Sequence, residues 1–588
     1  SIAHSKLPQS IQALLCEVTR RTHLCRSEKV DVARELAEHF HDGLEAGRSS
    51  DDLVKAFGDP RKAARLIRRA KLRNRPLAWR VWRRIKQAVA IAVAAVIVAY
   101  LYLAARYFTA RPTISHNYAA DLNAPAKSVP EDQRAWPLYR EALMTMTREP
   151  YYGWPEDKLP PDVADFYAAA EKPGGKHWDV VEKWLNQNRE PIKLVRKAAG
   201  RSRLGFFYGD PADKPWLTKF KYEPKLIDIS DENPVSRMLL PQVQELHFLF
   251  DLVVADAHRS AAERNAAEFV ADIEAIVGMA NQLYEDLPFS VQQLNSFTYL
   301  ENALKLVGES LLQWPDMLSE PDLRRIAHCF TGYAGGGTIR CRNSGERLMQ
   351  LDLYQRIYTD DGHGDGRFTP EGLRILEREV HDIKPEYRVE LPEPAAQPLL
   401  SAVMLSRRQM TDLTESTFDE LESEFSRPLW ERTNSSADDD FRRWKQSRLE
   451  TLRHLPVMLF VPLLEACRSM GERLTQERDA TLTALALELY HRRHGDWPKT
   501  LDGLVPDLLP AVPRDRLTGG PLLYRIVNDR PLLYSAGPDK KDDNGRPITD
   551  PYWMQFDWPP MKDTVTRKPP DGDWILWPPQ GDSPIGRK

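Results

Sequence analysis

The longest run of apolar positions in the chain extends from Ala88 to Ala105 (AVAIAVAAVIVAYLYLAA) and contains no charged residue. As an α-helix rising about 1.5 Å per residue, this run would be roughly 27 Å long, close to the thickness of a bilayer's hydrocarbon core. Rings that favour membrane interfaces stand near both ends: Trp79 and Trp82 before the run, and Tyr100, Tyr102 and Tyr107 toward its end. The pattern predicts one transmembrane helix within residues 76–110, and the alternative is a buried, alanine-rich core helix.

Positive charge is distributed unequally around this run. The cations ahead of it are Lys71, Arg73, Arg75, Arg80, Arg83, Arg84 and Lys86, whereas those close behind it are Arg106 and Arg111. Because positively charged flanks stay on the cytoplasmic side, we expect the N-terminus inside. A long, structured-looking segment precedes the run, which argues against a removable signal peptide. The expectation is a single-pass protein of the bacterial inner membrane, with its bulk extracytoplasmic (periplasmic).

Between residues 27 and 73, apolar positions at helical spacing alternate with signals that start and end helices. The apolar face of the first expected helix comprises Val30, Ala33, Leu36, Ala37, Phe40 and Leu44. The residues that separate this helix from two further ones are Gly47, Ser49 or Ser50 as a cap, Gly58, and then Asp59 with Pro60. The pattern predicts a small cytoplasmic helical domain over residues 1–75.

This stretch resembles the HAAS-type domain, a small helical module that precedes membrane segments in many bacterial proteins. The residues that carry the resemblance are Glu35, Leu36, His39, Asp42, Gly47, Leu53, Phe57, Gly58, Asp59 and Pro60. The resemblance implies a role in sensing or protein contact. His39 and His41 also raise the question of a metal ion, but helical residues two apart point to different faces, so packing or surface roles are expected.

Beyond a linker at residues 111–133, the chain is helical in pattern up to about residue 476. Two strongly periodic segments flank the short polar break HRSAAERN and predict an antiparallel helix pair. Further helices are expected from VQQLNSFTYLENALKLVGESLLQW and PDLRRIAHCF. The expected body, residues 134–476, is an irregular stack of α-hairpins, loosely similar to tetratricopeptide arrays but without a clean 34-residue period. Such stacks bind proteins or provide a frame.

Residues 477–550 combine a helix with strands. Leu482, Leu485, Ala486 and Leu489 form a buried stripe, and Gly495 ends the helix. GPLLYRIV and RPLLYSAG are two strands joined by Asn528-Asp529, a pair suited to a hairpin turn. The pattern predicts an α+β module at the end of a mainly α chain.

This module resembles the globular part of type II secretion major pseudopilins. The matching segments are the alanine- and leucine-rich helix, HRRHGDWPKTLDGL, PRDRLTGGPLLYR and LLYSAGPDKKDDNG. In that family the loop after the last strands holds calcium, which implies Asp539, Asp542, Asp543 and Asn544 as candidate ligands here. The membrane run differs from the family's, because basic residues precede it and it contains no glutamate, so reuse of the module as a tail domain is expected.

Two acidic loops are therefore candidates for a structural calcium ion, which takes six to eight oxygen ligands. In the loop from Tyr534 to Asp550, the alternatives are a solvated turn, with Lys540 and Lys541 between the acidic residues, and a catalytic cluster. In the segment DDGHGDGRFTPEG, Asp361 and Asp365 stand at plausible ligand positions, but Glu371 falls one residue short of the twelfth position of an EF-hand loop. An ordinary polar loop is the alternative there.

Composition removes other classes of function. The net charge is −3 with 28% charged residues, which gives no overall field for binding nucleic acid. The chain has no GxSxG, Walker, HExxH or glycine-rich dinucleotide sequence, so no enzyme is expected, although scattered side chains can still meet in space.

Cysteines and tryptophans complete the sequence picture. Cys16 and Cys25 are expected in the reducing cytoplasm, and Cys329, Cys341 and Cys467 in an oxidising space, where Cys329 and Cys341 could pair. Spacing alone does not decide the pairing. Residues 551–588, with Trp558, Trp574 and Trp577 among paired prolines, predict an extended strap packed on the body, or an exposed partner site.

These features together predict a scaffold or structural subunit of a membrane-associated complex, with other membrane or envelope proteins and the lipid bilayer as partners. The alternatives are an accessory component of a secretion system, favoured by the pseudopilin resemblance, and an uncharacterised extracytoplasmic enzyme.

Overall fold

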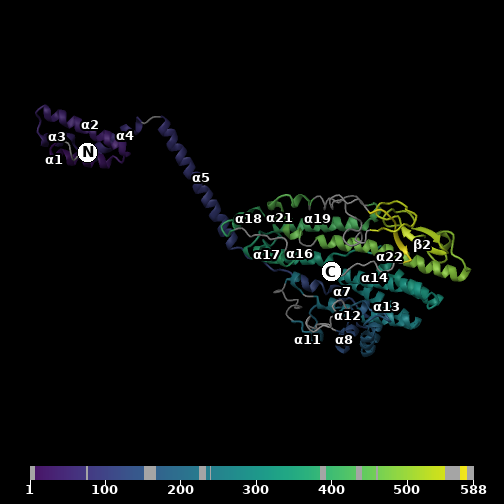
Figure 1. Ribbon diagram of the computed structural model, residues 1–588. Helices are drawn as coiled ribbons and strands as arrows, with labels where there is room; N and C mark the ends of the chain where they lie inside the picture. Colours follow the sequence, from purple (N-terminus) through teal and green to yellow (C-terminus); the bar gives the residue numbers. More distant parts are fainter. Residues whose placement is uncertain are drawn as a thin grey trace. The chain divides into compact units, whose positions relative to one another are not determined.

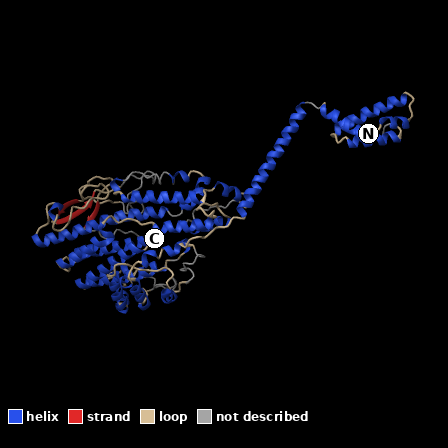
Figure 2. Cartoon of the chain, turned by 180° about the vertical axis from the view of Figure 1, so that it is seen from behind, coloured by secondary structure: helices blue, strands red, loops and turns tan. Residues whose placement is uncertain are grey.

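The computed structural model describes residues 7–74, 77–150, 167–223, 234–238, 240–383, 393–431, 440, 442–458, 461–549 and 570–578. The chain divides into two compact units, Ser1–Ala104 and Ala105–Lys588, each of which is considered by itself. Most of the described residues are helical, as the sequence pattern predicts, and the strands lie together next to the end of one long helix of the second unit (Figures 1 and 2).

The N-terminal unit contains α1 (Gln9–Arg21), α2 (Arg26–Glu45), α3 (Ser50–Phe57) and α4 (Pro60–Arg73), followed by α5 (Leu77–Phe108). The expected caps are present, because Ser49 Oγ accepts from the N–H of Asp52 at 3.2 Å and an Asp59 carboxylate oxygen accepts from the N–H of Arg61 at 2.7 Å. Gly47 and Gly58 have φ values of 79° and 77°, which favour glycine at helix ends.

Helix α1 was not among the expected helices, yet it supplies half of the small core of this unit. The buried residues of that core are Leu7, Ile11, Leu14, Leu15, Val18, Phe40, Leu53 and Ala64. The predicted apolar face of α2 was wrong at Val30, which is 52% exposed, while Val32 is buried. The difference arises because α1 covers α2 from a direction that the sequence of α2 alone does not indicate.

The main core of the second unit is built from long antiparallel helices. Its elements are α8 (Trp136–Thr145), α10 (Arg189–Ala199), α12 (Pro241–Ala262), α13 (Ala266–Asp286), α14 (Ser290–Gln313), α15 (Glu320–Gly332) and α22 (Val461–His494). Helices α12 and α13 pack on each other after a short turn, α13 packs on α14, and α14 packs on α22. The predicted antiparallel pair at the HRSAAERN break is confirmed, and the likeness to tetratricopeptide arrays stays a prediction.

Close packing in this core depends on one small residue. A Cβ atom on Gly278 of α13 would lie 2.5 Å from the carbonyl oxygen of Ala199, at the end of α10. The two helices therefore approach closely only because position 278 has no side chain.

Shorter elements cover this core. They are α6 (Tyr118–Asp121), α7 (Ala124–Lys127), η2 (Glu131–Gln133), η4 (Ala168–Ala170), α9 (Trp178–Gln187), η5 (Pro211–Asp213), α11 (Lys214–Lys219), η7 (Val235–Arg237) and η8 (Tyr333–Gly336). The expected linker at residues 111–133 is thus partly helical, and its Ala119 and Leu122 are buried in the main core.

A second hydrophobic cluster lies between residues 353 and 458. Its elements are α16 (Ser344–Ile357), α17 (Pro370–Ile383), α18 (Gln397–Val403), α19 (Arg407–Ser426), η9 (Leu429–Glu431) and α21 (Arg448–Met458). The largest buried side chains of this cluster are Tyr354, Tyr358, Phe368, Phe418 and Trp444.

The C-terminal strands form a small antiparallel sheet of order β1-β2-β3. The strands are β1 (Leu523–Val527), β2 (Arg530–Ser535) and β3 (Trp574–Trp577), and η10 (Leu501–Leu504) precedes them. The predicted hairpin is confirmed, with φ values of 49° and 58° at Asn528 and Asp529. Helix α22 runs through the expected domain boundary at residues 476 and 477 without a break, and Leu487 on it packs against the sheet.

The expected C-terminal strap is described only in part. Trp574 is 6% exposed and Trp577 packs against the core beside the sheet, so both rings lie on the body. Trp558 lies outside the described residues.

Candidate functional site: an exposed apolar helix and two acidic loops

The apolar run lies on α5, and the most apolar 18-residue window of the span from Val81 to Phe108 has a mean hydropathy of 2.5, with none of that window buried. Its large apolar side chains are half exposed or more: Val89, Ile91, Val93, Val96, Ile97, Val98 and Leu101, at 52–70%. Soluble proteins rarely expose a continuous apolar patch of this size to water. By length and composition α5 is able to cross a membrane. It is not the buried core helix that was the alternative, because its apolar window is exposed.

A second segment, Val235–Ala262, is also long and apolar enough to cross a membrane, and its most apolar 18-residue window has a mean hydropathy of 1.2. However, 71% of its most apolar window is buried inside the structure. It contains α12, whose Leu249 and Val253 are fully buried in the main core. Its apolar character is therefore accounted for by helix packing.

The basic end of α5 combines cations with aromatic rings. The guanidinium carbon of Arg83 lies 5.6 Å from the centre of the Trp79 ring, and Lys86 Nζ lies 5.4 Å from that of Trp82. Such pairs suit an interface between lipid and water, where the ring needs an apolar environment and the cation a polar one.

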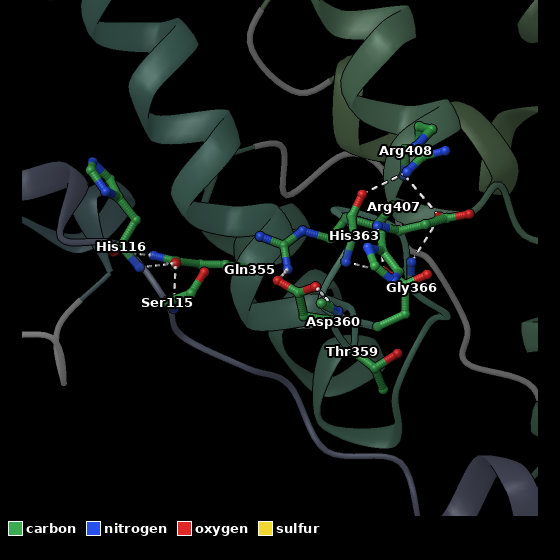
Figure 3. A network of polar contacts seen from close by, with 12 residues as sticks. Ser115, His116, Gln355, Thr359, Asp360, His363, Gly366, Arg407 and Arg408 are labelled. Carbon is green, nitrogen blue, oxygen red and sulfur yellow. Dashed lines mark hydrogen bonds and ion pairs between the residues drawn. The ribbon is translucent and has the colours of Figure 1, made fainter.

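The other end of α5 is held by the body. Tyr107 is 2% exposed, and its hydroxyl donates to Gln397 Oε1 of α18 at 3.4 Å. Further along, Gln355 of α16 accepts from the N–H groups of Ser115 and His116, both at 3.1 Å, and donates to the His116 carbonyl at 2.8 Å (Figure 3). The chain that leaves α5 is thus fixed to the second hydrophobic cluster within a few residues.

The acidic loop with Asp361 and Asp365 connects α16 to α17 and folds back on itself. The Tyr358 and Phe368 backbones form an antiparallel bridge, and the N–H of Asp361 donates to the Asp365 carbonyl at 2.9 Å. A carboxylate oxygen of Asp361 accepts from the N–H groups of His363 and Asp365 at 2.8 and 3.1 Å. These hydrogen bonds lower the pKa of Asp361 and are those of a tight polar loop.

The same loop holds the N-terminus of α19 (Figure 3). Asp365 accepts from the N–H of Arg408 at 3.1 Å, and Arg407 pairs with Asp360 at 2.9 Å. Although burial opposes ionisation of Asp365, the N–H groups that point at it lower its pKa. The carboxylates therefore act at a helix N-terminus, where negative charge is favourable.

The loop with Asp539 to Asn544 is similarly self-contained. An oxygen of Asp539 accepts from the N–H of Lys541 at 3.1 Å, and one of Asp542 accepts from the N–H of Asn544 at 2.8 Å and from the Tyr534 hydroxyl at 3.1 Å. Positive φ values at Lys540 and Asn544 give the loop its tight course. This is the geometry of consecutive turns.

Two aspartates that sequence analysis missed hold this loop and the sheet. Asp573 is fully buried and accepts from the N–H groups of Asp543 at 3.1 Å and Gly545 at 2.6 Å. Asp515, 1% exposed, accepts from Ser535 Oγ at 2.9 Å and from the N–H of Ala536 at 3.1 Å. Both are distant in sequence from their partners, and no motif points to them.

The pKa of Asp573 is higher than that of an exposed aspartate. Burial raises the pKa of Asp573, the two N–H donors oppose that change, and the nearby carboxylates of Asp542 and Asp543 add to it. One oxygen of Asp543 is buried without a hydrogen-bond partner among the described residues. The loop thus offers one uncommitted buried oxygen.

Over the described ranges, no group of three or more His, Cys, Asp or Glu side chains is arranged to hold a metal ion. Structural calcium at either acidic loop stays a prediction: at Asp539, Asp542, Asp543 and Asn544 from the resemblance, and at Asp361 and Asp365 from the spacing.

Buried ion pairs join the helices of the main core. Arg196 of α10 pairs with Asp256 of α12 at 2.9 Å and with Asp272 of α13 at 2.7 Å, and it also contacts Glu268. Burial raises the pKa of Asp272 well above its usual range, and Arg196 opposes that change. The cluster joins three helices through ion pairs.

A cavity of about 510 Å³, counting its opening to solvent, lies between α12 and α14. Its polar lining includes Lys172, His258, Glu309 and Ser310, and Lys172 Nζ donates to Glu309 Oε2 at 2.9 Å. Burial, and then the charges of Lys172 and Lys305, lower the pKa of His258 to about 4. The His258 imidazole is therefore neutral near pH 7 and suited to hydrogen bonding, and Glu309, the carboxylate of this lining, is paired with Lys172.

The structure joins none of the five cysteines in a disulfide. The Cys341 thiol lies in hydrogen-bond contact with Cys467, whereas Cys329 lies beside Glu274 and Arg325. The pairing considered between Cys329 and Cys341 therefore differs from the arrangement in the structure, because Cys467 approaches Cys341 from the distant helix α22.

The chain matches no family model, no curated protein and no solved structure.

Proposed function

We propose that the chain is a single-pass membrane protein that acts as a scaffold or interaction subunit of a membrane-associated complex. In this proposal α5 crosses the inner membrane of a bacterium, the N-terminal unit is cytoplasmic, and the second unit works on the opposite side. The observation that carries the proposal is the exposure of α5 along its apolar length.

Removal of the α5 side chains from water supplies free energy for membrane insertion. A fully exposed Val, Leu or Ile side chain gains about 1.5–3 kcal/mol when it leaves water. Helix α5 presents many such side chains and no described protein surface covers them. Lipid is the environment that removes them from water while leaving the helical backbone fully hydrogen-bonded.

An interaction role is supported by what the polar residues do. The acidic loops hold helix ends and strands through local hydrogen bonds, and the buried charges of the main core are paired across helices. Side chains used in this way stabilise a frame. The firm attachment of the segment after α5 to Gln355 suits a body held close to a bilayer.

The anchor is tested by flotation of the full chain with membranes and by extraction at alkaline pH. The proposal requires that the protein stay with the membrane fraction after extraction. Recovery of the wild-type protein in the soluble fraction would refute it.

Orientation is tested by adding protease to intact spheroplasts. Cleavage within residues 111–588, with residues 7–74 protected, is the expected pattern. The reverse pattern would place the body in the cytoplasm and remove the argument for partners outside.

The interaction role is tested by chemical cross-linking in intact cells, followed by purification in mild detergent. A stable set of cross-linked membrane or envelope proteins is expected with the full chain. The matched control is the chain truncated after residue 110, which keeps the anchor and should lose that set. An equal set from both proteins would contradict the role of the body.

A role as an accessory component of a secretion system is the second candidate. It is favoured by the order of elements in the C-terminal region, where the end of α22 is followed by an antiparallel hairpin and an acidic loop. Removing residues 519–588 should then impair secretion of reporter proteins while the membrane fraction of the chain is unchanged. Unimpaired secretion would eliminate this candidate.

A further inference from the structure

Three cysteines follow α5 in the chain, and two of them are brought together by the fold. Cys329 lies on α15, Cys341 lies in the extended segment at residues 337–343, and Cys467 lies on α22. More than a hundred residues separate Cys341 from Cys467, so their proximity is a product of tertiary structure.

The extended segment runs along one face of α22 through a series of contacts. Arg478 donates to the carbonyl of Gly337 at 2.8 Å, and Thr475 Oγ1 accepts from the N–H of Ile339 at 2.9 Å. The segment therefore runs antiparallel to α22, so that later residues of the segment contact earlier residues of the helix.

Gly471 continues this series. A Cβ atom on Gly471 would lie 2.6 Å from the Ile339 carbonyl oxygen, so the segment and the helix backbone nearly touch there. Residues 467, 471, 475 and 478 share one helix face because they are three or four positions apart. The next position on that face is Cys467, and the residue that reaches it is Cys341, whose thiol is in hydrogen-bond contact with it.

The surroundings of the pair are largely apolar, and Cys341 is partly exposed whereas Cys467 is buried. Cys467 is fully buried in the main core, and Cys341 packs against both the main core and the second hydrophobic cluster. Cys329, by contrast, lies beside Glu274 and Arg325. The fold thus selects one pair of the three that are possible.

The positions of the two cysteines in the chain are also informative. Cys341 precedes the first residue of the second hydrophobic cluster, Leu353, and Cys467 follows the last, Met458. A covalent bond between them would close the chain at the base of that cluster. A bond that closes a long loop restricts the unfolded chain strongly.

We propose that Cys341 and Cys467 form a disulfide that fastens the base of the second hydrophobic cluster to α22. The proposal rests on the proposed function for its compartment, because it requires the second unit to face an oxidising space. The contact between the two residues is independent of that orientation.

The chemistry is thiol–disulfide exchange with a protein that carries an oxidised dithiol. The Cys341 thiolate attacks one sulfur of the donor disulfide and forms a mixed disulfide, and the Cys467 thiolate then displaces the donor. The donor leaves as a dithiol with two electrons gained, and the two cysteine protons pass to its sulfurs.

The environment of the pair affects the rate of this reaction. The hydrogen bond to Cys467, and then burial, raise the pKa of the Cys341 thiol, which disfavours the thiolate in the folded state. Exchange is therefore slow once the segment lies along α22, both for formation of the bond and for its reduction.

The test counts reactive thiols on the full chain. Cells are treated with N-ethylmaleimide, the protein is denatured without reduction in the presence of the same reagent, and its intact mass is measured. Because the chain has five cysteines, the proposal expects labels on Cys16, Cys25 and Cys329 alone, and labels on all five after reduction.

Variants identify the pair. Cys467→Ser should carry a label on Cys341 without reduction, and Cys329→Ser, the matched control, should simply lose the label of Cys329. Reduction should lower the unfolding midpoint of the wild-type body by about 5 °C and leave that of Cys467→Ser unchanged. Labels on all five cysteines of the unreduced wild-type protein would overturn the disulfide.

A second arm separates the sources of failure. The purified full chain in detergent is unfolded, reduced and refolded with oxidised glutathione. All five cysteines could be labelled in cells while Cys341 and Cys467 become protected after this refolding. The inferred contact would then be correct, and the assumption that the second unit faces an oxidising space would be wrong. If they stay reactive after refolding, the inferred contact itself is wrong.

Discussion

Helices α5 and α12 are both long and apolar enough to cross a membrane, yet their surroundings are opposite. Helix α12 lies in the main core, where α13, α14 and α10 cover it, and its polar residues Asp251 and Asp256 are buried with partners. Along its apolar run, α5 has no such cover, and its apolar side chains stay exposed. Hydropathy identifies helices whose side chains are more stable outside water. Tertiary packing determines whether protein or lipid surrounds those helices.

The largest expected effect comes from placing charge in each helix. Val93→Asp with Val96→Asp should weaken membrane insertion by about 2.5–3.5 kcal/mol for each substitution, and should leave the unfolding of the body unchanged. Val253→Asp in α12 should destabilise the body by about 4 kcal/mol or more, because it buries an unpaired carboxylate. Alkaline extraction measures the first effect and thermal unfolding the second.

Matched controls are Val96→Leu and Val253→Ile, which preserve apolar character. If the α5 aspartates lowered the unfolding midpoint of the body as much as Val253→Asp does, α5 would be a covered helix and the comparison would fail.

Truncation of apolar side chains gives a smaller contrast. Leu249→Ala in α12 should cost the body about 2–5 kcal/mol, since Leu249 is fully buried and its loss leaves a cavity. Leu101→Ala in α5 removes a side chain that is 58% exposed, and should change the unfolding free energy of the body by less than about 0.5 kcal/mol. Chemical unfolding in detergent compares the two, and equal costs would contradict the difference in burial.

The pH dependence sharpens the contrast further, because α12 carries His258 and the apolar run of α5 has no titratable side chain except tyrosine. The pKa of His258 is lowered to about 4 by burial, below its value of about 6.5 in the unfolded chain. The unfolded state therefore binds a proton more readily, and stability is lost as the pH falls from 6.5 toward 4.

Between pH 7 and pH 5 the loss due to His258 should be about 1–2 kcal/mol. His258→Gln should make the unfolding midpoint less dependent on pH over that range. His363→Gln, in an exposed loop, is the control. An unchanged pH profile in His258→Gln would show that His258 is not responsible.

The smallest effect is expected at the loop that holds α19. Asp365→Ala removes the acceptor for the N–H of Arg408 and should cost about 1 kcal/mol, as loss of a helix N-terminal acceptor does. The measurement is chemical unfolding with and without added calcium. A calcium-dependent gain in the wild-type protein that Asp365→Ala abolishes would support the ion that the spacing suggested.

Local features were predictable from the sequence because short-range chemistry determines them. The caps at Ser49 and Asp59, the hairpin turn at Asn528 and Asp529, and the helix pair around HRSAAERN all depend on neighbouring residues. Helix α1 was also detectable, since Ile11, Leu14, Leu15 and Val18 have helical spacing.

Long-range contacts were not predictable in this way. Asp573 and Asp515 look like loop residues, and only the folded chain brings backbone N–H groups to their carboxylates. The contact between Cys341 and Cys467 depends on how a segment lies along a distant helix, which spacing cannot reveal. The buried charges around Arg196 likewise resemble the solvated face of a helix in sequence.

Helix α22 extends over 34 residues, which corresponds to about 51 Å of rigid rod. It packs against α14 and α15, and its C-terminal part supports the β-sheet. A force applied to the hairpin would therefore be transmitted along one continuous helix to the main core. The sheet and the main core are therefore mechanically coupled through α22, which contributes side chains to both.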